Sequence, residues 1–180
     1  EILVHGIEDD FTIKKIEAAI IDLLDKSNLT NRVLGYESAD FGRMDLNQIQ
    51  AKYGSSKATI SEKAVLIKLS DTFRYSMSPN ELYDYTRGIW IISKDRMAAT
   101  EYAFAVYDGV IQETYKISGW FEAGSTFHSR QQDKDSWKKK QRFEFVGIID
   151  ESMRKKYRHK SVNHYFPYGA QNPMRYTYEI

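Results

Sequence analysis

The sequence predicts an α+β protein in which helices flank a mixed β-sheet, with a small helical segment at the N-terminal end. Three observations predict this class. Asp108-Gly109 joins two stretches rich in aromatic and β-branched residues, 103–107 and 110–117, which is the pattern of a β-hairpin with a type I′ turn. Further short apolar runs lie on both sides of this hairpin. Near the start of the chain, apolar residues instead recur at helical spacing.

The first predicted element is an amphipathic helix over residues 9–27. Its apolar residues recur three and four positions apart: Ile13, Ile16, Ile20, Leu23 and Leu24. Gly54-Ser55-Ser56 interrupts the chain further on and marks a candidate boundary. We therefore expect a helical N-terminal segment over 1–58 and the main α+β domain over 59–180.

The next predicted elements are a central strand over 64–69 and a helix that begins after Ser78. Ser78 can cap this helix, Pro79 suits its first position, and Glu81 completes a capping box three residues after the cap. A strand over 89–92 and a short helical turn over 94–101 follow. The helix is therefore expected to lead directly into the sheet.

The second arm of the hairpin alternates in a way that predicts one apolar face, formed by Ile111, Glu113, Tyr115 and Ile117. Glu113 interrupts the apolar pattern of that face. The remaining expected elements are a long polar loop over 121–141, a strand over 142–149, a basic helix over 151–159 and a last strand within 174–180.

Composition excludes several classes of protein. The chain of 180 residues has no cysteine, so disulfides, thiolate nucleophiles and cysteine-based zinc sites are excluded, and we expect a cytoplasmic protein. No apolar run approaches the roughly 18 residues of a membrane span, so we expect no membrane partner. No glycine-rich nucleotide loop is present, and we expect no cofactor.

Positive charge gathers late in the chain, although the net charge is only +1. Residues 129–160 hold eleven basic and five acidic residues. Such clusters can bind phosphates, and they are also common on solvated loops and helix ends. The candidate phosphate-binding residues are Lys138, Lys139, Lys140, Arg142, Arg154, Lys155, Arg158 and Lys160.

Aromatic side chains near strand ends predict a pocket that could stack an unpaired base. Trp90, Trp120 and Tyr107 would form its walls, while Arg87 and Asp108 would supply polar contacts at its mouth. The alternative is that Trp90 and Trp120 belong to the hydrophobic core, because tryptophan is highly buried on average.

No residue pattern predicts a catalytic or metal site outright. His159 and His164 lie five apart, unlike the i, i+4 pair of helical zinc proteases, and we expect no histidine-bound metal.

A PD-(D/E)xK nuclease would have to use Asp108, Glu113 and Lys116, but one residue too many separates the last two. Gly88-Ile89-Trp90, followed after eleven residues by Tyr102-Ala103-Phe104, has spacing near that of GIY-YIG nucleases. A small metal-dependent nuclease is therefore the alternative function.

The order of elements from residue 64 to residue 180 resembles the PUA-like barrels, the superfamily with ASCH, EVE, YTH and SRA domains. The resembling stretches are AVLIKL, SPNEL, RGIW, YAFAVYDGVIQETYKISGW and RFEFVGIID. TRGIW, YAFAVYDGV and KSVNHYFPYGAQNP also resemble an uncharacterised bacterial group associated with restriction-type proteins. Residues 1–58 fall outside the resemblance.

The resemblance implies that the mixed sheet is curved into a partly closed barrel. It also implies a non-catalytic nucleic-acid-binding module that reads a modified or flipped base, as the targeting domain of a restriction or defence system. The expected partner is nucleic acid, DNA before RNA, together with a fused or associated nuclease. We expect no catalytic residues.

Overall fold

The computed structural model describes residues 6–24, 46, 49, 56–74, 77–129, 141–169 and 171–179. Contacts divide the chain into two units, 1–45 and 46–180, and each is described by itself. The first unit contains α1 (Asp10–Leu24), where Asp9 Oδ1 accepts a hydrogen bond of 2.7 Å from the Thr12 amide. The helix expected over 9–27 is thus confirmed over 10–24, and its last three residues lie outside the described ones. The expected boundary after residue 58 stays a prediction.

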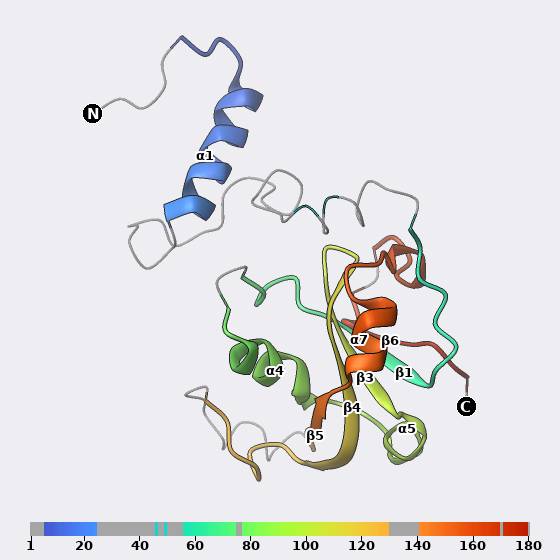
Figure 1. Cartoon of the computed structure of the whole chain (residues 1–180). Coiled ribbons are helices and arrows are strands. Elements are labelled where there is room, and N and C mark those ends of the chain that lie inside the picture. Colours follow the sequence, from blue (N-terminus) through green and yellow to red (C-terminus); the bar gives the residue numbers. More distant parts are fainter. Residues whose placement is uncertain are drawn as a thin grey trace. The chain divides into compact units, whose positions relative to one another are not determined.

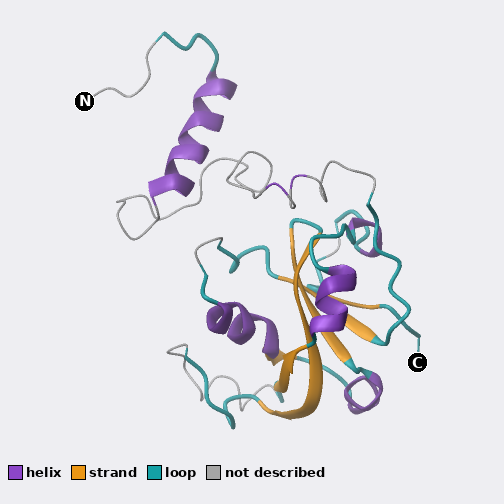
Figure 2. Cartoon of the chain, viewed as in Figure 1, coloured by secondary structure: helices purple, strands orange, loops and turns teal. Residues whose placement is uncertain are grey.

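The second unit is built on a six-stranded mixed sheet that curls into a half-barrel with helices around it (Figures 1 and 2), which confirms the predicted fold class. The strand order is β2-β5-β4-β3-β1-β6. Of the paired strands, β1 and β3 run parallel, and the other pairs are antiparallel. The strands are β1 (Ala64–Lys68), β2 (Gly88–Trp90), β3 (Tyr102–Tyr107), β4 (Val110–Glu122), β5 (Phe143–Ile149) and β6 (Met174–Tyr176). The helices are α4 (Pro79–Arg87), α5 (Lys94–Ala99), α7 (Glu151–Tyr157) and the 3-10 turn η2 (Asn163–Tyr165).

The β3–β4 hairpin forms as its turn residues predict, because Asp108 (φ 48°) and Gly109 (φ 69°) both adopt positive φ. Its second arm, however, is longer than expected and ends at Glu122. The register also shifts between Ala105 and Val106, where a bulge changes the alternation of β4. Ile111 consequently packs in a different cluster from Tyr115, and the prediction that both lie on one face is wrong.

The sheet has a core on each face. In β1, Val65 and Ile67 belong to one buried cluster, and Ala64 and Leu66 belong to the other, as a two-residue period requires. Side chains of α4 pack against the first cluster and side chains of α7 against the second, so the two helices cover opposite faces. Figure 1 shows α4 and α7 on either side of β4.

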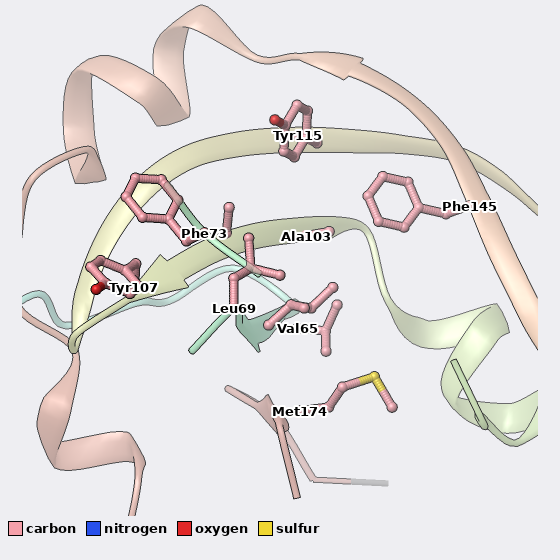
Figure 3. Packing of buried hydrophobic residues seen from close by; sticks show 10 residues of the cluster. Val65, Leu69, Phe73, Ala103, Tyr107, Tyr115, Phe145 and Met174 are labelled. Carbon is pink, nitrogen blue, oxygen red and sulfur yellow. The ribbon is translucent and has the colours of Figure 1, made fainter. Parts of the chain in front are cut away.

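The core on the α4 face is rich in aromatic residues (Figure 3). Phe73 stacks on Tyr107 with ring centroids 4.4 Å apart, and Tyr115 lies 6.2 Å from Phe145 on the neighbouring strand. Such pairs add roughly 0.5–1.5 kcal/mol each beyond the area they bury. This cluster holds α4, which contributes Leu82, Tyr83 and Tyr85, against the sheet.

The helix α4 starts where the capping signals place it. The Glu81 amide donates to Ser78 Oγ at 3.2 Å, and the Ser78 amide donates to Glu81 Oε2 at 2.8 Å, which completes the predicted capping box. At its other end the chain enters β2 at Gly88 without an intervening loop. The cap therefore fixes where α4 begins, and α4 ends directly at the edge strand β2.

We expect the stability of this unit to depend on Glu62 in acid. Burial raises the pKa of Glu62, but hydrogen bonds from Lys156 Nζ, at 2.7 Å, and from the Tyr157 hydroxyl outweigh it and bring the pKa from 4.5 to about 2. A carboxylate with a lowered folded-state pKa stabilises the protein above its unfolded pKa, and that stability is lost as the pH falls towards the folded value. Glu62→Gln should therefore lower the free energy of unfolding at pH 7, and the difference from the parent should shrink between about pH 4.5 and pH 2. Urea unfolding at a series of pH values measures both, and a difference independent of pH would contradict the assignment.

Candidate functional site

A pocket of about 490 Å³ lies where the curled sheet brings its two edges together. The edge strand β2 supplies one wall, and the end of β1 with the residues just before β6 supplies the other. Its lining residues are Lys68, Leu69, Ser70, Asp71, Thr72, Tyr85, Gly88, Ile89, Trp90, Arg142, Gln171 and Pro173. Its volume falls in the range of sites for small molecules, roughly 300–1,000 Å³.

Two aromatic residues line the pocket, Trp90 from β2 and Tyr85 from α4. Both are half-buried and also pack against the core cluster of the α4 face. Trp90 Nε1 donates a hydrogen bond of 2.8 Å to the Thr86 carbonyl, which fixes the indole against the last turn of α4. The pocket thus has an aromatic wall held by the core behind it.

Charged residues stand around this wall. Lys68 is exposed at the end of β1, and no salt bridge holds it within the described part of the chain. Arg142 is half-buried, and its Nη1 donates to the Ile89 carbonyl at 3.1 Å, which leaves other N–H groups of the guanidinium to face a ligand. Asp71, which is exposed, adds one carboxylate. Two cations and one anion give the lining a net positive charge.

Behind Gly88 lies a cluster of buried ionisable side chains, which we call the buried ionic cluster: Asp84, Arg87, His128 and Glu144. Arg87 Nε lies 3.2 Å from Asp84 Oδ1, and His128 Nε2 lies 2.5 Å from Glu144 Oε2. The four side chains are at most 8% exposed. A Cβ added to Gly88 would lie 3.1 Å from Glu144 Cβ and 3.3 Å from His128 Cε1, so the cluster directly backs the pocket wall.

The buried ionic cluster anchors the segment 123–129, which follows β4. Glu144 accepts hydrogen bonds from the amides of Gly124, at 3.1 Å, and Thr126, at 2.9 Å. Burial raises the pKa of Glu144, but these bonds and those from the Thr126 hydroxyl and His128 outweigh it, so its pKa lies below the ordinary value. Because solvent barely reaches these groups, we assign the cluster the role of holding the wall of the pocket.

The structure separates the residues expected to form one base-binding pocket. Trp90 lines the pocket, whereas Arg87 belongs to the buried ionic cluster and Tyr107 stacks on Phe73 in the core. Asp108 occupies the hairpin turn. Trp120 packs on Phe145 with ring centroids 5.6 Å apart, and its Nε1 is buried with no hydrogen-bond partner among the described residues. Whether these four contact a base stays a prediction.

The expected phosphate-binding residues also divide. Arg142 lines the pocket, and Lys138, Lys139 and Lys140 lie outside the described residues. The others lie on or just after α7, on the opposite face of the sheet from α4: Arg154, Lys155, Arg158 and Lys160.

Two of these α7 cations have partners within the protein. Arg154 pairs with Glu113 at 3.3 Å and with Glu151 at 3.2 Å, and Arg158 Nε donates to the Gln112 carbonyl at 2.9 Å. Lys155 is exposed. Part of the basic run therefore fixes α7 to β4.

Three charged or aromatic residues of the pocket were not among the predicted site residues: Lys68, Asp71 and Tyr85. Tyr85 also packs against the core cluster of the α4 face. Lys68 ends an apolar run, and an isolated cation at the end of a central strand is the one local signal that could have drawn attention to it.

Within the described ranges, no group of three His, Asp or Glu side chains is arranged to hold a metal ion. No helix in the same ranges combines the length and apolar character of a membrane span.

Comparison with protein-family models, curated proteins and solved structures found no significant match to this chain. The class that the structure defines is thus an α+β half-barrel with a pocket between its sheet edges, and the PUA-like resemblance stays a prediction.

Proposed function

We propose that this protein is a nucleic-acid-binding module in which the pocket between the sheet edges receives a single unpaired or flipped base. The observation that carries the proposal is the juxtaposition of Trp90 and Tyr85 with Lys68 and Arg142 around one pocket. Aromatic faces stack bases of any identity, and the cations attract the backbone. Double-stranded substrate would have to open, because a stacked base cannot reach such a wall.

The resemblance extends this proposal to modified bases and to a role as the targeting domain of a restriction system. The curved sheet and the size of the pocket support this extension. A screen of single-stranded and duplex oligonucleotides, with and without modified bases, tests this extension.

Removal of the Trp90 ring tests the proposal directly. Base stacking contributes roughly 1–3 kcal/mol, so Trp90→Leu should weaken binding of single-stranded oligonucleotides by about 5- to 150-fold. Leucine retains apolar volume for the core, and Trp90→Phe, which keeps an aromatic face, should retain most of the affinity. Fluorescence anisotropy with labelled oligonucleotides at fixed salt measures the effect.

The matched control is Trp120→Leu, because Trp120 is also half-buried beside the core but is not one of the residues lining the pocket. Equal losses of affinity in the Trp90 and Trp120 variants, with both folded by circular dichroism, would contradict the assignment of the base to this pocket.

Incubation with Mg²⁺ distinguishes the nuclease alternative, since a binding module leaves the oligonucleotide length unchanged.

A further inference from the structure

We propose that the pocket recognises one nucleotide with its phosphate. Lys68 and Arg142 bind that phosphate from opposite edges of the half-barrel. This inference rests on the proposed function and makes it more specific. It predicts that free nucleoside monophosphates bind, that nucleosides bind much more weakly, and that the ligand bridges the two edges of the sheet.

The size and composition of the pocket support a single nucleotide. About 490 Å³ is room for one base with its sugar and phosphate, and the aromatic residues occupy one part of the lining while the cations come from separate segments. Tyr85 and Trp90 come from α4 and β2, which are joined directly at Gly88. A base placed on this wall leaves its phosphate to be held elsewhere in the same pocket.

The cations reach the pocket from distant points of the sheet. Lys68 ends β1, beside the edge strand β6, whereas Arg142 immediately precedes β5, beside the edge strand β2. Arg142 is itself tied to β2 through the Ile89 carbonyl. A phosphate held by both side chains therefore connects the two ends of a sheet that is otherwise not closed by strand pairing.

Bridging has a consequence for stability. A ligand that binds only the folded state stabilises it in proportion to the logarithm of its concentration above the dissociation constant. Because the bound phosphate would join the two edges, it should also slow hydrogen exchange in the edge strands. The amides of β2 and β6 are the ones to follow.

Removing a positive or a negative charge from the lining should change nucleotide affinity in opposite directions, which tests the inference. Lys68→Gln removes a cation, and because a hydrogen bond to a charged group contributes roughly 1.5–3 kcal/mol, nucleotide affinity should fall by about tenfold or more. Asp71→Asn removes the carboxylate and should raise nucleotide affinity. Neither change should alter nucleoside affinity by a comparable factor, because a nucleoside has no phosphate. Both residues are exposed, so we expect both variants to fold.

The experiment compares the four common ribonucleosides and deoxyribonucleosides with their 5′-monophosphates, by isothermal titration and thermal shift at low salt, where Coulomb interactions are least screened. The chain used is the full one, with Lys155→Gln on α7 as the control for removal of an exposed cation from the opposite face. The expected result is tight binding of monophosphates, weak binding of nucleosides, a loss in Lys68→Gln and a gain in Asp71→Asn. Inorganic phosphate alone should bind weakly, because it cannot stack.

Two outcomes would overturn the inference while the proposed function stands. One is oligonucleotide binding with which no monophosphate competes. The other is equal binding of nucleosides and monophosphates. In that case Lys68→Gln would reduce the affinity for both kinds of ligand alike, or Lys155→Gln would reduce nucleotide affinity as much as Lys68→Gln does. If neither oligonucleotides nor monophosphates bind, the inference and the proposed function both fail.

Discussion

Arg87→Met is expected to lower the free energy of unfolding by about 3–5 kcal/mol, the cost of removing one partner from a buried ion pair. Arg87 Nη2 donates to the Thr126 hydroxyl and to the Phe127 carbonyl, the latter at 2.8 Å, while its Nε lies 3.2 Å from Asp84. Without the guanidinium, the buried carboxyl groups of Asp84 and Glu144 lose the cation that lies 3.2 Å from the first and 3.8 Å from the second. Urea unfolding followed by tryptophan fluorescence measures the change.

The melting temperature should fall by roughly 10–20 °C, given the usual relation between stability and melting temperature for a unit of this size. Arg74→Met is the matched control, because Arg74 pairs with Glu81 at 3.8 Å with both side chains more than 40% exposed. Such a surface pair contributes about 0–1 kcal/mol. If the Arg87 and Arg74 variants unfold alike, the buried ionic cluster does not hold the pocket wall.

Arg87 was expected to supply a polar contact at the mouth of the base pocket. In the structure its side chain pairs with Asp84 and also turns towards 126–127 and Glu144, which lie far away in the sequence. Sequence spacing places a side chain near a strand end, but only the tertiary fold determines which way it faces.

Features specified by neighbouring residues were the predictable ones. The Asp108-Gly109 turn and the capping box of Ser78 and Glu81 form as expected, because each depends on a few adjacent residues and on backbone geometry. The α+β class followed from the apolar periodicity of the strands and helices in the same way.

Features that depend on distant pairing were not predictable. The bulge opposite Ala105 and Val106 depends on how β4 pairs with β3, and it places Ile111 in the other core cluster. The pocket itself requires β2 and the end of β1 to meet, although 19 residues separate Lys68 from Gly88, so its lining could not be predicted from neighbouring residues. For the same reason Lys68 and Asp71 escaped attention.

Gly147→Ala is expected to destabilise the sheet by about 1–3 kcal/mol, at the upper end of that range, as overpacking of a rigid site does. A Cβ on Gly147 would lie 2.4 Å from the Lys116 carbonyl oxygen, which is backbone of the paired strand β4 and cannot rotate away. Strands β4 and β5 would have to separate at this point. The Gly147 amide also donates to the Tyr83 hydroxyl at 2.9 Å, so the same movement would loosen α4 from the sheet.

Gly119→Ala on β4 isolates the effect of that contact. Both substitutions reduce the backbone freedom of the unfolded chain, which by itself favours the alanine variants by roughly 0.4–1 kcal/mol. At Gly119, however, the nearest atoms belong to the ring of Phe121, at 3.3 and 3.5 Å, and a side chain that is 44% exposed can move. Gly119→Ala should therefore be close to neutral in urea unfolding. Since α4 supplies Tyr85 to the pocket, Gly147→Ala should also weaken oligonucleotide binding where Gly119→Ala does not. Equal stability of the two variants would contradict this prediction. It would mean that β4 and β5 can separate at little cost in free energy and that their packing does not hold the wall of the pocket rigid.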